Sequence, residues 1–283
     1  MSGFITGHPK NTKKLLHMNI AEKVIKRIYV FLFARKALYR LNLLLYKLSL
    51  RGLGILNYED DQVSGERAFI RFLLASGHLE KGVVLDVGAN VGHYSILLRT
   101  SKVSLPVYAF EPHPVAFRYL QQAAQQHDFT PVPIGAGHEV ATAVIYDYAD
   151  NGGSEHASMY EEVITGLRQQ AADAVNITLT TVDDFVTDNG IREIALLKID
   201  TEGNELNVLK GAARCIANGT IKVIQVEFNE MNVIARTFFK DIADLLPDYD
   251  FYRLLPDGPC ALGPYDVIAF EIFAFQNIVA IRR

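Results

Sequence analysis

Cysteine is scarce in this chain, which has only Cys215 and Cys260 among its 283 residues. Two cysteines are too few for a disulfide framework or a cysteine-rich zinc site, so a reducing compartment is the simplest interpretation. A strong overall charge is missing as well, because the formal net charge is −4. The chain as a whole therefore has no general attraction for polyanions, and we expect no nucleic-acid partner.

Long apolar runs and targeting patterns are also missing. Residues 1–9 lack the apolar stretch and the small-residue cleavage site of a signal peptide. No uninterrupted apolar run approaches the roughly 18–20 residues that span a bilayer. Nearly half of the residues, 49%, are hydrophobic, which is enough for one large domain with an appendage. We expect a cytoplasmic protein.

Acidic residues are nearly absent from residues 10–51, where eleven Lys and Arg stand against Glu22 alone. The segment has a formal charge of +10, which leaves −14 for the rest of the chain. This asymmetry, with apolar residues interleaved, favours a basic amphipathic helix that lies on the inner face of a membrane. Packing on the domain, or on a second copy in a homo-oligomer, is the alternative. We place a helical extension at residues 1–57 and the main domain at residues 58–283.

The most informative stretch is VVLDVGANVG, residues 83–92. Its apolar residues predict a buried strand that includes Asp86, and Gly88 and Gly92 then lead into a helix. A strand, a glycine turn and a helix in this order receive nucleotide-like ligands in parallel α/β sheets. The spacing is not the G-x-G-x-x-G of dinucleotide folds. D-x-G-x-x-x-G is similar to the first motif of Rossmann-like S-adenosylmethionine-dependent methyltransferases. An ordinary turn with Asp86 as a helix cap is the alternative.

A second predicted strand, residues 106–112, ends on Glu111. An acidic residue about twenty positions beyond the glycine turn suits the hydroxyls of a ribose. A solvated carboxylate at the end of the strand is the alternative. Pro114 then opens a long helix, and residues 129–137 form a third strand and turn, where an adenine ring would lie.

The pattern changes between residues 140 and 181, where two strands flank a polar loop. That loop either lines a substrate pocket or is a surface excursion. The candidate substrate-binding residues in it are Asn151, Ser154 and His156, with Ser158 beside them.

Charged residues collect where two further buried strands end. Lys198, Asp200 and Glu202 follow the apolar run that starts at residue 194, and Glu227, Asn229 and Glu230 end the strand at 221–230. Ligands bind at the carboxyl ends of parallel strands, and buried ionisable groups are costly unless they function or pair. We expect a helix near 234–246 and two closing antiparallel strands at 250–255 and 267–275. Pro256, Gly258 and Pro259 would form the turn between those strands.

Together these motifs resemble the FkbM family of methyltransferases. The motifs that carry the resemblance are LDVGANVGHYS (85–95), AFEPHP (109–114), TVDDF (181–185), LLKIDTEGNELNVLKGA (196–212) and QVEFNE (225–230). The resemblance implies a Rossmann-like class I fold, a seven-stranded and mostly parallel α/β sheet with an antiparallel last strand. It also implies methyl transfer from S-adenosylmethionine, commonly to a hydroxyl of a sugar or a polyketide.

The resemblance also implies roles for individual residues. Asp86, Gly88, Asn90 and Gly92 would hold the methionine end of the cofactor, and Glu111 its ribose. The acceptor side would be formed by Asp200, Glu202 and Glu227. The sequence GAGH at residues 135–138 departs from the usual pattern, so no adenine contact is assigned.

A methyl acceptor with a hydroxyl group needs a base within hydrogen-bond reach. We expect Asp200 to be that base or to orient the acceptor, and Glu202 and Glu227 to bind acceptor hydroxyls. Lys198 either contacts the substrate or pairs with one of these carboxylates. Mg²⁺ between Asp200 and Glu227 is a second version, but a metal-free site is the commoner arrangement for such carboxylates.

The expected function is O-methylation of a sugar hydroxyl in a glycan or glycolipid. A polyketide or another small natural product is the alternative acceptor. A nucleotide-dependent oxidoreductase or epimerase is a competing class, and the glycine spacing and the lack of a Tyr-x-x-x-Lys pair argue against it. A non-catalytic binding module is the last alternative.

Overall fold

The computed structural model describes residues 20–149 and 157–283. Its contacts group the chain into two compact units, which divide between Ser49 and Leu50. The sequence-based boundary at residue 57 stays a prediction. Each unit is described separately.

The first unit is helical. It contains α1 (Ile20–Phe33), a short 3-10 helix η1 (Lys36–Leu38) and most of α2 (Tyr39–Gly52). The Tyr29 hydroxyl donates to Asn42 Oδ1 at 2.7 Å, and Asn42 Nδ2 donates to the Phe33 carbonyl at 2.9 Å. Across the described residues, every helix is too short or too polar to cross a membrane.

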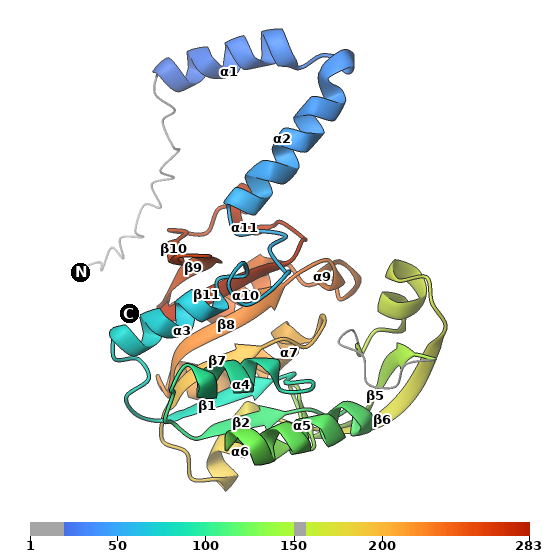
Figure 1. Ribbon diagram of the computed structural model, residues 1–283, viewed down its shortest axis with the longest axis vertical. Helices are drawn as coiled ribbons and strands as arrows, with labels where there is room; N and C mark the ends of the chain where they lie inside the picture. Colours follow the sequence, from blue (N-terminus) through green and yellow to red (C-terminus); the bar gives the residue numbers. More distant parts are fainter. Residues whose placement is uncertain (1–19, 150–156) are drawn as a thin grey trace, which may run out of the picture. The chain divides into compact units, whose positions relative to one another are not determined.

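The second unit is built on an eight-stranded sheet (Figure 1). Five parallel strands come first, followed by three antiparallel ones. In spatial order the strands are β3 (Thr130–Val132), β2 (Val107–Phe110), β1 (Val83–Val87), β7 (Ile194–Ile199), β8 (Ile221–Phe228), β11 (Gln276–Arg282), β9 (Tyr249–Leu255) and β10 (Gly258–Ala261). The predicted class I fold with its antiparallel last strand, β11, is confirmed, and β10 adds an eighth strand.

Helices cover both faces of this sheet because its strands are apolar on both sides. One core packs Phe69, Leu98 and Leu120 against Val84 and Leu196. These side chains come from α3 (Glu66–Ala75), α4 (His93–Thr100), α5 (Pro114–His127), β1 and β7. The opposite core is covered by α6 (Val182–Asp188), α7 (Glu205–Lys210), α8 (Ala213–Ala217) and α10 (Phe239–Leu245). The sheet is therefore doubly wound.

A small second sheet branches from the chain after β3. It joins β4 (Gly135–Ala136), β6 (Ala172–Thr180) and β5 (Ala141–Tyr148), which confirms the two predicted strands between residues 140 and 181. A π-helical turn, η2 (Val163–Leu167), precedes β6, and its Val163 and Ile164 pack on Met231 of α9 (Met231–Ile234). The small sheet is thus attached to the segment that follows β8.

Two sequence-based predictions near the end of the chain were wrong. The apolar residues 267–275 form a short helix, α11 (Val267–Phe270), and an irregular segment, while the closing strand is β11. Asp266 starts the helix because its side chain accepts from the backbone N–H groups of Ile268 and Ala269. Gly258 and Pro259 belong to β10 instead of the turn, and the helix expected at 234–246 is split into α9 and α10.

Candidate active site

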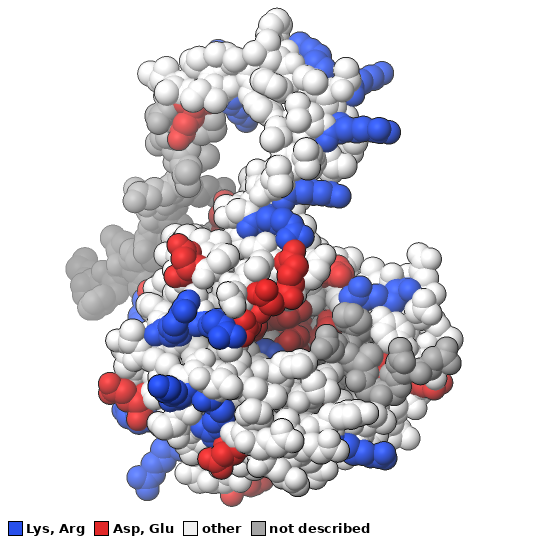
Figure 2. Space-filling view, in the orientation of Figure 1, with Lys and Arg blue, Asp and Glu red and all other residues white. Residues whose placement is uncertain are grey.

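A cavity of about 1210 Å³ opens at the carboxyl ends of β1, β2, β7 and β8. Because the strand order reverses between β1 and β7, this is the switch point where doubly wound sheets bind ligands. Figure 2 shows Asp and Glu side chains gathered in a hollow of the surface. The acidic residues that line the cavity are Glu59, Asp60, Asp61, Glu66, Glu111, Asp200, Glu202, Glu227 and Glu230.

The glycine turn between β1 and α4 forms one wall. Gly88, Asn90 and Gly92 all have positive φ angles, of 84°, 46° and 95°. A Cβ on Gly88 would lie 1.7 Å from the carbonyl oxygen of Asp200, so only glycine allows the turn after β1 to pass against the end of β7. Gly88 and Asn90 line the cavity. The turn thus brings the two predicted halves of the site together.

Asp86 lies beneath this turn instead of facing the cavity. Its side chain is fully buried, and the Ser95 hydroxyl donates to Oδ2 at 2.7 Å. Its other oxygen, Oδ1, is 3.8 Å from Lys198 Nζ. Burial raises the pKa of Asp86, and the charge of Lys198 opposes that shift. We therefore propose that Asp86 acts on the cofactor indirectly, through the turn that it supports.

Glu111 lines the cavity at the end of β2 and is 7% exposed. The backbone N–H of Asn90 donates to Oε2 at 2.9 Å, and that of His113 donates to Oε1 at 2.7 Å. Burial raises the pKa of Glu111 to about 7, although these two backbone bonds pull it down. Both oxygens are thus held in place, and their remaining lone pairs are available to a ligand.

His113 is a residue of this wall that the sequence interpretation missed. It is buried, its Nδ1 accepts from the backbone N–H of Val115 at 3.2 Å, and its Nε2 lies 3.6 Å from Asp147 Oδ2. Burial lowers the pKa of His113, and Asp147 opposes the shift. An imidazole that accepts through Nδ1 has its proton on Nε2, so it faces Asp147 as a neutral donor. The histidine in AFEPHP was the available signal.

Lys198 connects the two halves of the site. Its Nζ lies 2.9 Å from Asp200 Oδ2 and 5.2 Å from the centre of the Tyr94 ring, and the residue is only 6% exposed. Burial alone would lower the pKa of Lys198, but Asp200, Asp86 and Glu66 outweigh it and raise the pKa. Of the two expected roles, the structure shows the pairing with carboxylates.

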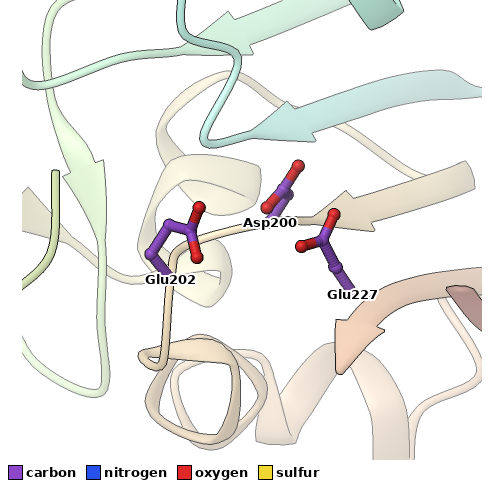
Figure 3. A group of neighbouring side chains, drawn as sticks. All are labelled: Asp200, Glu202 and Glu227. Atoms are coloured by element: carbon purple, nitrogen blue, oxygen red, sulfur yellow. The ribbon is translucent and has the colours of Figure 1, made fainter. Parts of the chain in front are cut away.

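Three carboxylates converge on the acceptor side of the cavity. Asp200, Glu202 and Glu227 each have an oxygen within 4.8 Å of the others, and Figure 3 shows the three groups pointing toward one another. Asn229 Nδ2 donates to Glu227 Oε1 at 2.9 Å and to Glu202 Oε2 at 3.3 Å. Burial, with Asp200 and Glu202 nearby, raises the pKa of Glu227 well above its usual value.

The turn that holds this triad is fixed from below by Glu205, which the sequence interpretation also missed. Its Oε1 accepts from the backbone N–H groups of Thr201 and Gly203, both at 3.0 Å. Asn232 donates to Oε2 at 2.9 Å. Glu202 itself has a positive φ of 51°, a conformation that a non-glycine residue keeps only where its surroundings impose it.

A buried polar network closes the cavity floor. The Tyr94 hydroxyl donates to Gln225 Oε1 at 2.7 Å, and Gln225 Nε2 donates to Glu66 Oε1 at 3.0 Å. Glu66 is the first residue of α3, and burial raises its pKa. The network ties α3 and α4 to β8, so the helix before β1 belongs to the site.

The predicted substrate-binding residues are only partly visible. Asn151, Ser154 and His156 lie outside the described residues. Ser158 is buried, and its hydroxyl donates to the Glu202 carbonyl at 2.7 Å, so it tethers the small sheet to the triad turn. Met159 and Arg168 of the same excursion line the cavity.

The residues present fit S-adenosylmethionine. Glu111 offers two fixed oxygens to the two hydroxyls of a ribose, the geometry that dinucleotide folds use for the same group. A cavity lined mainly by carboxylates also suits a positively charged sulfonium. Mg²⁺ would find three oxygen ligands in the triad, but the Lys198 ammonium beside Asp200 already supplies a positive charge there.

Comparison with known proteins agrees with this arrangement. Residues 86–252 match the methyltransferase FkbM domain. The hexuronic acid methyltransferase AglP of Haloferax volcanii is 27% identical over 169 residues, which are 57% of this chain and 62% of that protein. The 31-O-demethyl-FK506 methyltransferase FkbM of Streptomyces tacrolimicus is 28% identical over 46% of this chain and 58% of its own length. The chain thus spans about three fifths of the curated relatives it matches.

A solved structure is similar as well. The methyltransferase FkbM from Methylobacillus flagellatus has a TM-score of 0.43 and 15% identity, over 83% of this chain and 59% of that one. The family match covers more than half of the chain and confirms the predicted methyltransferase class, of which S-adenosylmethionine is the expected methyl donor. The chain belongs to the methyltransferase FkbM domain family.

Proposed function

We propose that this protein is an S-adenosylmethionine-dependent O-methyltransferase that acts on a hydroxyl of a sugar in a glycan or glycolipid. The observation that carries the proposal is the division of a single cavity into two acidic ends. Glu111 offers fixed oxygens at the end of β2, and the triad of Asp200, Glu202 and Glu227 lies at the ends of β7 and β8.

The bound cofactor would supply an electrophilic methyl group, and the protein must align an acceptor oxygen with it. Asp200 is the proposed base because its carboxylate lies in the cavity and Lys198 favours its ionised form. The base would take the hydroxyl proton as the oxygen attacks. Glu202 and Glu227 would accept hydrogen bonds from neighbouring hydroxyls, an arrangement that suits a polyhydroxylated acceptor.

The charge of the cavity favours a neutral acceptor. Its lining has nine carboxylates against Lys198, Arg67 and Arg168. A second anion brought to the triad would be repelled over a few ångströms in a partly buried site. We therefore expect an uncharged sugar, whereas the relative from Haloferax is named for a hexuronic acid. The relative from Streptomyces, named for FK506, supports a polyketide as the second candidate acceptor.

Two measurements test the proposal. Calorimetry should show heat on titration with S-adenosylmethionine and with its demethylated product. Incubation with a cofactor labelled on the methyl group, in the presence of neutral glycans, uronate-containing glycans and polyketides, should label the neutral glycans. Cofactor binding without label in any acceptor would favour a non-catalytic module, and no heat on well-folded protein would remove the proposal.

A peripheral membrane contact belongs to the same proposal. The acceptor would then be the sugar of a membrane-bound glycolipid at the inner membrane face. The charge asymmetry between residues 10–51 and the rest of the chain supports this contact. A homo-oligomer formed through the same helices is the alternative.

A further inference from the structure

The helices α1 and α2 leave a large apolar surface uncovered within their own unit. No residue of α1 is buried. Along one face of α1, the large apolar side chains are between 48% and 82% exposed. They are Ile20, Val24, Ile25, Ile28, Phe31 and Leu32. Their spacing of three, four and seven residues places them on one side of the helix, and such a continuous apolar face marks an interaction surface.

Basic side chains border this face and form a cavity with it. Lys23, Lys26, Arg27 and Arg35 line a cavity of about 600 Å³ together with Val30 and Phe31. The Arg35 guanidinium lies 5.4 Å from the centre of the Phe31 ring. Blue side chains in Figure 2 mark several Lys and Arg residues of the helical unit. Four cations beside apolar carbon match a lipid phosphate and the glycerol and acyl groups below it.

Extending the membrane contact named above, we propose that residues 20–49 bind an anionic phospholipid surface. Lys23, Lys26, Arg27 and Arg35 would contact lipid phosphates, and the apolar face of α1 would enter the interface. Each helix has 14 residues, about 21 Å at 1.5 Å per residue, which is shorter than the roughly 30 Å hydrocarbon core. The helices would therefore lie on the membrane instead of crossing it.

Charge decides between lipid and a second copy of the chain as the occupant. Residues 20–49 contain seven Lys and Arg and one acidic residue, Glu22. A dimer through this surface would bring two such sets of positive charges together, whereas an anionic lipid surface neutralises them. A polyanion such as nucleic acid would match the charges but would leave the apolar face in water.

The test is co-sedimentation of the full chain with vesicles of phosphatidylcholine, with and without phosphatidylglycerol. The test variant replaces Lys23, Lys26, Arg27 and Arg35 by Gln. A matched control replaces four exposed lysines of the second unit, Lys81, Lys102, Lys210 and Lys240, by Gln, which changes the net charge equally. One Lys or Arg near an anionic surface is worth roughly fivefold in affinity. We expect the test variant to bind anionic vesicles at least tenfold more weakly and the control to bind like the wild type.

Further arms keep the result interpretable. Binding should need phosphatidylglycerol, should fall at high salt, and should be lost when Ile28 and Phe31 are replaced by Ser. Equal binding by the test variant, or equal binding to pure phosphatidylcholine, would overturn the proposal. So would light scattering that shows a dimer which the Ile28 and Phe31 replacements dissociate, without vesicle binding. Calorimetry of the same proteins with S-adenosylmethionine reports separately on the methyltransferase unit.

Discussion

The two ends of the cavity hold their carboxylates in opposite ways. At the cofactor end, backbone N–H groups bind both oxygens of Glu111. At the acceptor end, Asp200, Glu202 and Glu227 crowd within 4.8 Å, with Lys198 and Asn229 as their side-chain partners. Backbone donors fix a group that only binds. A group that must accept a proton needs free lone pairs and close charges, which is the arrangement of the triad.

This contrast predicts its largest effect at Asp200. Replacing Asp200 with Asn keeps the shape but removes the proposed base, so the rate of methyl transfer should fall about 10²–10⁴-fold. Cofactor affinity should stay within a few-fold, because the change lies at the acceptor end. Rates measured with an acceptor from the labelling screen, and calorimetry with S-adenosylmethionine, check both statements. Asp257→Asn, in the exposed turn between β9 and β10, is the matched control. An unchanged rate for Asp200→Asn would assign the base elsewhere.

The second effect should appear at the opposite end. Glu111→Gln replaces one accepting oxygen by an amide that cannot accept from either backbone N–H. Hydrogen bonds to a charged group are worth about 1.5–3 kcal/mol, so cofactor affinity should fall about tenfold to a hundredfold. Calorimetry measures this, with the exposed Glu139→Gln as control. If affinity stayed at the wild-type value while the fold was intact, Glu111 would not bind the ribose.

A smaller effect should follow from pH. Burial raises the pKa of free Glu111 to about 7, and ribose hydroxyls donate only to its ionised form. Binding then releases a proton below pH 7 and none well above it. Cofactor affinity should be constant above pH 8 and fall up to about tenfold per pH unit below 7. Calorimetry in a pH series shows this slope, and a flat profile in the wild type would contradict the assignment.

The sequence predicted the parts of this site that local patterns determine. Apolar runs and the spacing of Gly88 and Gly92 indicated β1 and its turn, and Glu111, Asp200 and Glu227 were placed at strand ends in the correct order. Parallel strands end at one edge of a sheet, so the motifs alone were enough to predict that these residues gather.

The rest depends on contacts between distant segments. Asp86 turns away from the cavity because Ser95 and Lys198 hold it, and nothing in LDVGAN shows this. Glu66 and Gln225 meet across 159 residues of sequence. Residues 267–275 are as apolar as a strand, but Asp266 caps a helical turn and Phe270 is buried in the core. Side-chain direction is thus what the patterns could not give.

The smallest effect should come from removing metal ions, and it tests whether Lys198 or a cation balances the acceptor end. Lys198 Nζ lies 2.9 Å from Asp200 Oδ2, so a second positive charge at the same carboxylate would be repelled by the ammonium. We expect a chelator to change the methyl-transfer rate less than about twofold, against the much larger loss expected from Asp200→Asn. Loss of activity that Mg²⁺ restores would instead place a cation between Asp200 and Glu227. The acceptor hydroxyl would then be activated by that ion, and Lys198 would only orient its ligand.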